Sequence, residues 1–141
     1  MVVFQTFNPE FSAIQTAKEQ DYKKFYEEEI KLRKEFDYPP FSQVIRFLIS
    51  GADEKRTSQA AEEISEHFKI IINKKNLEND IKISSASSCA IEKLNNEYRY
   101  EILIKNLAEK KGHQFISRFF KNIRLPKDLK IKIDVNPIDL I

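Results

Sequence analysis

Two kinds of apolar periodicity alternate along the chain from residue 43 onward, and their order limits the folds open to it. Alternation at every second residue predicts strands over 43–50, 81–84, 97–105 and 130–135. Apolar side chains three or four positions apart predict helices over 53–74 and 108–124. The polar segment 85–96 shows neither period and is expected to be a connection. The predicted order of elements is therefore β-α-β-β-α-β.

This order is that of the ferredoxin-like split fold, in which two helices cover one face of a four-stranded sheet. We therefore expect residues 43–141 to form an α+β sandwich of this class. The apolar strand positions would face the helices, and the alternate positions would form the opposite face of the sheet.

The first 42 residues have a different pattern. Val2–Phe7 alternates and predicts a short strand, and residues 10–20 predict a short helix. A longer helix is expected over 21–36, with Asp21 as its cap and the prolines of Tyr38–Phe41 as its stop. A strand at the very start of the sequence is either an edge strand or part of a longer protein, and the second interpretation is favoured.

Composition excludes several kinds of site. The 141 residues contain two glycines, Gly51 and Gly112, which lie too far apart for a glycine-rich phosphate loop. The one cysteine, Cys89, can form neither an internal disulfide nor a zinc site with several thiolates.

No apolar run approaches the roughly 20 residues of a membrane helix, so we expect a cytoplasmic protein without membrane contact. His67 and His113 are expected to be ordinary helix residues.

Charge is distributed unevenly, although 24 Lys+Arg nearly balance 22 Asp+Glu. The opposite face of the predicted sheet would carry six cations against Glu97, Glu101 and Asp134. The six cations are Arg46, Lys82, Arg99, Lys105, Lys130 and Lys132. Such a face could follow a phosphate backbone, could be a merely solvated basic surface, or could dock on another domain. The pattern alone leaves these three interpretations open.

Several short sequence motifs occur along the whole chain in a fixed order. They are Phe4–Glu10, Asp21–Tyr22, Phe25–Glu29 with Arg33, Tyr38–Phe41, Ile91–Lys93, Tyr98–Tyr100 with Ile102–Lys105, and Asp134–Pro137. In order and spacing they resemble the C-terminal end of the PriA family, the bacterial replication restart helicases also called primosomal protein N′. The segment that is rich in proline in this family corresponds to Ser85–Lys93 here, and Ser85–Lys93 contains no proline.

The resemblance implies a division into three parts. Residues 1–20 would be the truncated tail of the second helicase lobe, residues 21–42 a connector helix, and residues 43–141 the C-terminal domain. That domain resembles a ribosomal S10-like fold in this family, which agrees with the β-α-β-β-α-β order. The family's ATPase motifs and zinc-binding cysteines lie upstream. The fragment itself is therefore expected to be non-catalytic and to need no cofactor, whereas the full-length family uses ATP and zinc.

The resemblance also implies partners: branched or forked DNA, the acidic tail of single-stranded DNA-binding protein, and the remainder of the helicase. Phosphate contacts would come from Arg99 together with Lys93, Lys105, Arg46, Lys82, Lys130 and Lys132. Weaker candidates for binding the acidic tail are Lys105, Lys110, Lys111 and Arg118. The alternative is a structural brace whose basic face is buried against the helicase lobes. An enzyme on this scaffold has no supporting group of catalytic residues.

Overall fold

The computed structural model describes residues 3–137, apart from the side chains of Glu109 and Lys111. The chain divides into two compact units, Met1–Phe36 and Asp37–Ile141.

The first unit contains two helices, α1 (Ser12–Glu19) and α2 (Tyr22–Glu35), close to where the sequence predicted them. Asp21 caps α2, because its carboxylate accepts a hydrogen bond from the backbone N–H of Lys24 at 2.9 Å. The predicted strand over Val2–Phe7 is wrong for residues 3–7, and Val2 lies outside the described residues. A strand needs a neighbour to satisfy its backbone groups, and the described part of this unit offers only helices.

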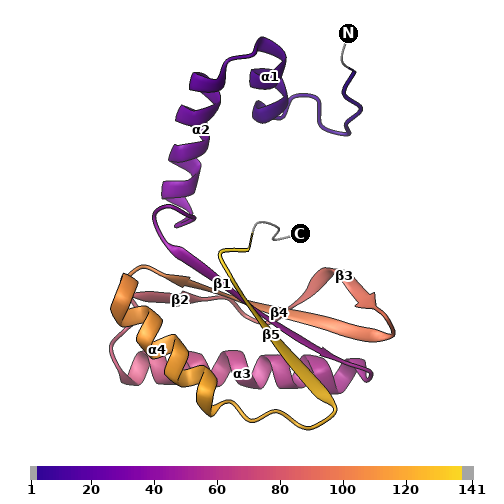
Figure 1. Ribbon diagram of the computed structural model, residues 1–141, viewed down its shortest axis with the longest axis vertical. Helices are drawn as coiled ribbons and strands as arrows, with labels where there is room; N and C mark the ends of the chain where they lie inside the picture. Colours follow the sequence, from indigo (N-terminus) through magenta and orange to yellow (C-terminus); the bar gives the residue numbers. More distant parts are fainter. Residues whose placement is uncertain (1–2, 138–141) are drawn as a thin grey trace. The chain divides into compact units, whose positions relative to one another are not determined.

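The second unit is an antiparallel sheet with two helices on one face (Figure 1). Its elements are β1 (Gln43–Gly51), α3 (Glu54–Lys74), β2 (Ile81–Ile83), β3 (Ser87–Leu94), β4 (Glu97–Asn106), α4 (Glu109–Asn122) and β5 (Leu129–Val135). The strands lie in the order β2-β4-β1-β5, and every paired strand is antiparallel to its neighbour. This topology confirms the ferredoxin-like α+β class.

The sheet has a fifth strand, which the sequence did not predict. Within the segment 85–96, which was expected to be a connection, β3 pairs with β4 through a bulge between Ser88 and Lys93. Asn95 and Asn96 join the two strands with φ angles of 52° and 62°, the left-handed values of a tight hairpin turn. Strands β3 and β4 with this turn, residues 87–106, are called the hairpin below.

The core lies between the sheet and its two helices. Phe47 and Ile49 of β1 and Ile102 of β4 are fully buried, and they meet Phe68 of α3, which is also fully buried. Phe119 of α4 places its ring edge-on to Phe68, with the ring centres 4.2 Å apart. Since strand side chains alternate, this packing fixes which residues point to the opposite face of the sheet.

Candidate nucleic-acid interface

The register of the sheet places six of the predicted cations on the face that the helices do not cover. Arg46 lies opposite Asp134, and Lys82 lies opposite Lys105. Arg99 and Lys130 lie on either side of Ser50, and Lys132 pairs with Leu48. All six therefore share the face away from Phe47 and Ile102, as the alternation predicted.

Carboxylates on the same face neutralise part of this charge. Arg46 contacts Asp134, with Nη2 and Oδ2 3.2 Å apart, and Glu101, with Nη1 and Oε2 4.0 Å apart. Lys132 shares Asp134, with Nζ 3.8 Å from Oδ2. These ion pairs lower the attraction that Arg46 and Lys132 can offer to a phosphate.

Two further lysines are also paired. Lys130 forms an ion pair with Glu97, and Ser50 donates a second hydrogen bond to the same carboxylate. The Lys130 hydrogen bond, followed by the Ser50 hydrogen bond, lowers the pKa of Glu97 below its usual value. Lys82 pairs with Asp37, which precedes β1. Four of the six cations on this face are thus paired with carboxylates among the described residues, and Asp37 joins the three carboxylates that the alternation had placed there.

Lys105 lies over an aromatic ring. Its Nζ is 4.0 Å from the ring centre of Tyr38. Burial lowers the pKa of Lys105, while the Asp37 carboxylate opposes that effect and the nearby Lys82 ammonium adds to it. This cation is therefore held against the protein surface.

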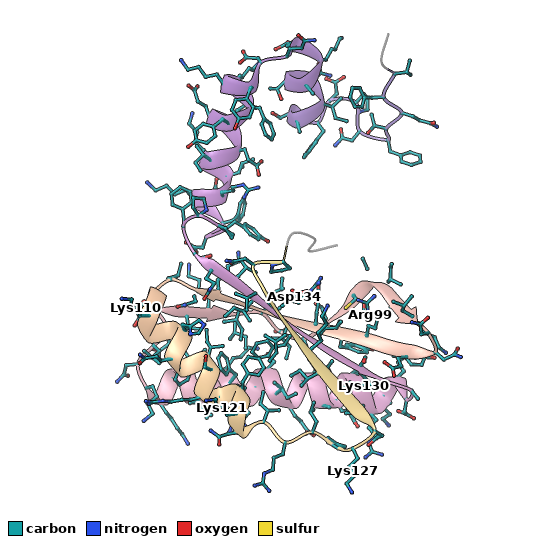
Figure 2. All side chains as sticks on the ribbon, in the orientation of Figure 1. Arg99, Lys110, Lys121, Lys127, Lys130 and Asp134 are labelled. Carbon is teal, nitrogen blue, oxygen red and sulfur yellow. The ribbon has the colours of Figure 1, made fainter. Side chains whose placement is uncertain are left out.

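Of the cations predicted to contact phosphate, the two not yet described are Arg99 and Lys93, and both belong to the hairpin (Figure 2 labels Arg99). Among residues 3–137 neither forms an ion pair with a carboxylate. Lys93 places its Nζ 4.4 Å from the ring centre of Tyr98. Because Lys93 pairs with Tyr98 in the register, it lies on the opposite face of the hairpin from Arg99. The hairpin therefore carries an uncompensated cation on each face, with an aromatic ring beside one of them.

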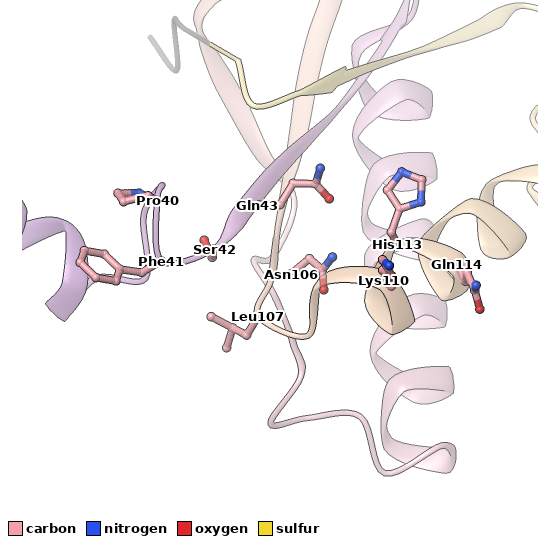
Figure 3. A pocket seen from close by; sticks show the side chains of 9 residues that line it. All are labelled: Pro40, Phe41, Ser42, Gln43, Asn106, Leu107, Lys110, His113 and Gln114. Carbon is pink, nitrogen blue, oxygen red and sulfur yellow. The ribbon is translucent and has the colours of Figure 1, made fainter.

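The four residues predicted to bind an acidic tail do not form one site. Lys105 belongs to the sheet face, and the side chain of Lys111 lies outside the described residues. Lys110 lines a pocket of about 540 Å³ at the start of α4 (Figure 3). Arg118 lines a different cavity, between α3 and α4.

The Lys110 pocket is lined mainly by polar side chains that the sequence pattern did not single out. Gln43 enters it from β1, and His113 and Gln114 from α4 (Figure 3). Asn106, which is buried, also lines it, and the Oδ1 atom of Asn106 accepts a hydrogen bond from the backbone N–H of Ala108 at 3.2 Å. These residues come from three separate segments, so no local motif could have revealed them.

Other chemistry has little structural support within the described residues. Cys89 is buried in β3, and burial raises the pKa of its thiol, which disfavours the reactive thiolate. No group of three or more His, Cys, Asp or Glu side chains in the described part of the chain could hold a metal ion. Among residues 3–137 there is also no helix both long and apolar enough to cross a bilayer.

Fold and site together define a ferredoxin-like α+β domain whose hairpin carries two cations, Arg99 and Lys93, without a carboxylate partner among the described residues. A family described as the primosomal protein N C-terminal domain matches residues 34–138, and the chain belongs to this family.

Relatives in three bacteria carry the name replication restart protein PriA. The chain is 29% identical to the Borreliella burgdorferi protein over all of its length, which is 21% of that protein. It is 31% identical to the Chlamydia muridarum protein over 97% of the chain and 18% of the relative. It is 30% identical to the Bacillus subtilis protein over 96% of the chain and 17% of the relative. The chain thus spans about a fifth of the length of the relatives that it matches.

Proposed function

We propose that this chain is the DNA-binding and docking domain of a bacterial replication restart helicase and contacts branched DNA through the hairpin. The observation that carries the proposal is that the hairpin holds Arg99 on the sheet face and Lys93 on the opposite face, and that the described residues supply a carboxylate to neither of them. The domain itself is non-catalytic. ATP hydrolysis, unwinding and zinc binding belong to the rest of the full-length protein, which works in the cytoplasm.

The physical basis of the proposed DNA binding is the release of counterions from the DNA phosphates when protein cations replace them. An unpaired guanidinium or ammonium gains a full ion pair when it meets a phosphate, whereas a paired one must first leave its own carboxylate. Arg46, Lys130 and Lys132 therefore contribute less than their number suggests. Tyr98 adds a ring on which an unpaired base of a branched DNA can stack.

Charge reversal at Arg99 tests the proposal. We expect Arg99→Glu to weaken binding of a forked DNA by about tenfold at low salt, because one strong phosphate contact becomes a repulsion. Fluorescence anisotropy measures the dissociation constant. Lys121→Glu is the matched control, since it makes the same kind of charge change at an exposed helix position away from the hairpin (Figure 2). Equal losses in the two variants would remove DNA binding from the hairpin.

The acidic tail of single-stranded DNA-binding protein is proposed to bind at the Lys110 pocket. Lys110 supplies an exposed cation there, and Gln43, His113 and Gln114 supply hydrogen-bonding groups. We expect Lys110→Glu to weaken binding of a synthetic tail peptide by at least fivefold in anisotropy titrations, because an acidic ligand then meets a like charge. Lys121→Glu again serves as control. A tail peptide that binds both variants equally would contradict this assignment.

A bracing role is the second candidate, and the exposed surface of the first unit favours it. Helix α2 has no buried residue, and Phe7, Tyr22 and Phe36 are each more than half exposed. An apolar surface of this kind marks a contact with another part of a protein. Since relatives are about five times longer, the preceding domains are the proposed partner. No loss of DNA binding in Arg99→Glu would favour this role over direct contact.

A further inference from the structure

The outer surface of the helical layer contains a groove that the proposed DNA site does not use. It lies between α3 and α4 and has a volume of about 570 Å³, within the range of sites that take up ligand or peptide side chains. Its floor is apolar: Ile64 and Phe119 belong to the core, and Ile71, Phe115 and Ile123 are half-buried. We call it the α3–α4 groove.

The edge of the α3–α4 groove is basic. Lys75, Arg118 and Arg124 line it, and all three side chains are exposed. In the part of the chain that the structure describes, no carboxylate forms an ion pair with any of them. Glu63 is the single carboxylate among the lining residues. The sheet face behaves differently, because most of its cations are paired within the domain.

We propose that the α3–α4 groove binds an acidic amphipathic helix of a partner protein. An apolar channel between two helices accepts the apolar stripe of a third helix, whose side chains at i, i+3, i+4 and i+7 fill the channel. Acidic residues flanking that stripe would then meet Lys75, Arg118 and Arg124. Charge complementarity thus selects an acidic helix over a basic one.

A nucleic acid fits the same surface less well. Its phosphates would find the basic edge, but they would also cover an apolar floor with charged groups and leave that floor without contacts. The inference is independent of the proposed DNA site and of the Lys110 pocket, since the groove shares no residue with either.

The test uses the whole chain and a designed probe. The probe is a fluorescein-labelled helical peptide of about 18 residues, long enough to hold a helix, with Leu at the stripe positions and Glu on both flanks. NMR chemical-shift mapping locates its binding, and anisotropy gives its affinity. We expect shift changes centred on Ile71 and Phe115, and at least tenfold weaker binding to the double variant Arg118→Glu/Arg124→Glu.

Three controls make the outcome decisive. A second peptide with Lys in place of Glu should bind at least tenfold more weakly than the acidic peptide. A third peptide with Ser in place of Leu should not bind. The protein variant Lys121→Glu, on α4 but outside the groove, should bind the acidic peptide as the unaltered chain does. The proposal is overturned if the acidic peptide leaves Ile71 and Phe115 unshifted, or if both charged peptides bind equally. It is also overturned if single-stranded oligothymidylate displaces the peptide from the groove, or if the groove shifts depend on protein concentration as in self-association.

Discussion

Replacing Phe68 with Ala is expected to lower the free energy of unfolding by about 3–5 kcal/mol, the range found for buried Phe-to-Ala changes. Phe68 has no exposed surface and lies at the centre of the aromatic core. Its ring centre is 4.2 Å from that of Phe119 and 5.6 Å from that of Phe115, so the truncation leaves a cavity bounded by rigid rings. Phe47 adds an edge-on contact from the sheet.

Urea denaturation followed by circular dichroism measures this loss. Ile70→Ala is the matched control, because Ile70 lies on the same helix and its side chain is 49% exposed. We expect that variant to lose less than about 1 kcal/mol. A similar loss for both variants would mean that the aromatic cluster is not the main source of stability.

Replacing Gly112 with Ala is expected to destabilise the domain, although the same change usually stabilises a helix by up to about 1 kcal/mol. A Cβ atom at Gly112 would lie 1.8 Å from Oδ1 of Asn106 and 2.5 Å from its Cγ. Asn106 is buried at the end of β4 and has a short side chain, so it has little room to move. Overpacking of this kind costs about 1–3 kcal/mol, which reverses the sign of the usual effect.

A double-mutant cycle separates this clash from general damage to α4. Asn106→Ala removes the obstructing atoms, so Gly112→Ala should cost less in that background than in the unaltered chain. Thermal or urea unfolding of the four proteins gives the coupling energy. Additive losses would show that the close approach of Gly112 to Asn106 does not set the spacing between α4 and β4.

Most of the second unit could be predicted from its apolar periodicity. The observed strand β1 and helix α3 begin and end within about one residue of the predicted ranges. Strand β3 was missed because its residues are mostly exposed on both faces and show no alternation. Backbone pairing with β4 and the Asn95–Asn96 turn hold it in place, and neither leaves a hydrophobic signature. Residues 87–94 contain no proline, which is compatible with this pairing, since proline cannot donate to a sheet.

The face of the candidate site could also be predicted, but the ion pairs on it could not. Alternation alone placed Arg46, Arg99 and Lys130 on one face, and the register agrees. Neutralisation depends on carboxylates far away in the sequence, as in the pairs Lys82–Asp37 and Lys130–Glu97. Those pairs exist only once the strands are in register. The pattern therefore did not show which cations are paired and did not distinguish Arg99 from its neighbours.

The central claim, that the hairpin contacts DNA phosphates through Arg99 and Lys93, is tested most directly by the salt dependence of forked-DNA binding. Each phosphate contact contributes about 0.9 to the slope of log K against log salt concentration. The variant Lys93→Ala/Arg99→Ala should therefore show a slope about two units shallower than the unaltered chain. The control Lys121→Ala/Lys127→Ala, which removes two exposed cations elsewhere (Figure 2), should leave the slope nearly unchanged. An unchanged slope in the hairpin variant, or an equal change in both, would contradict the claim.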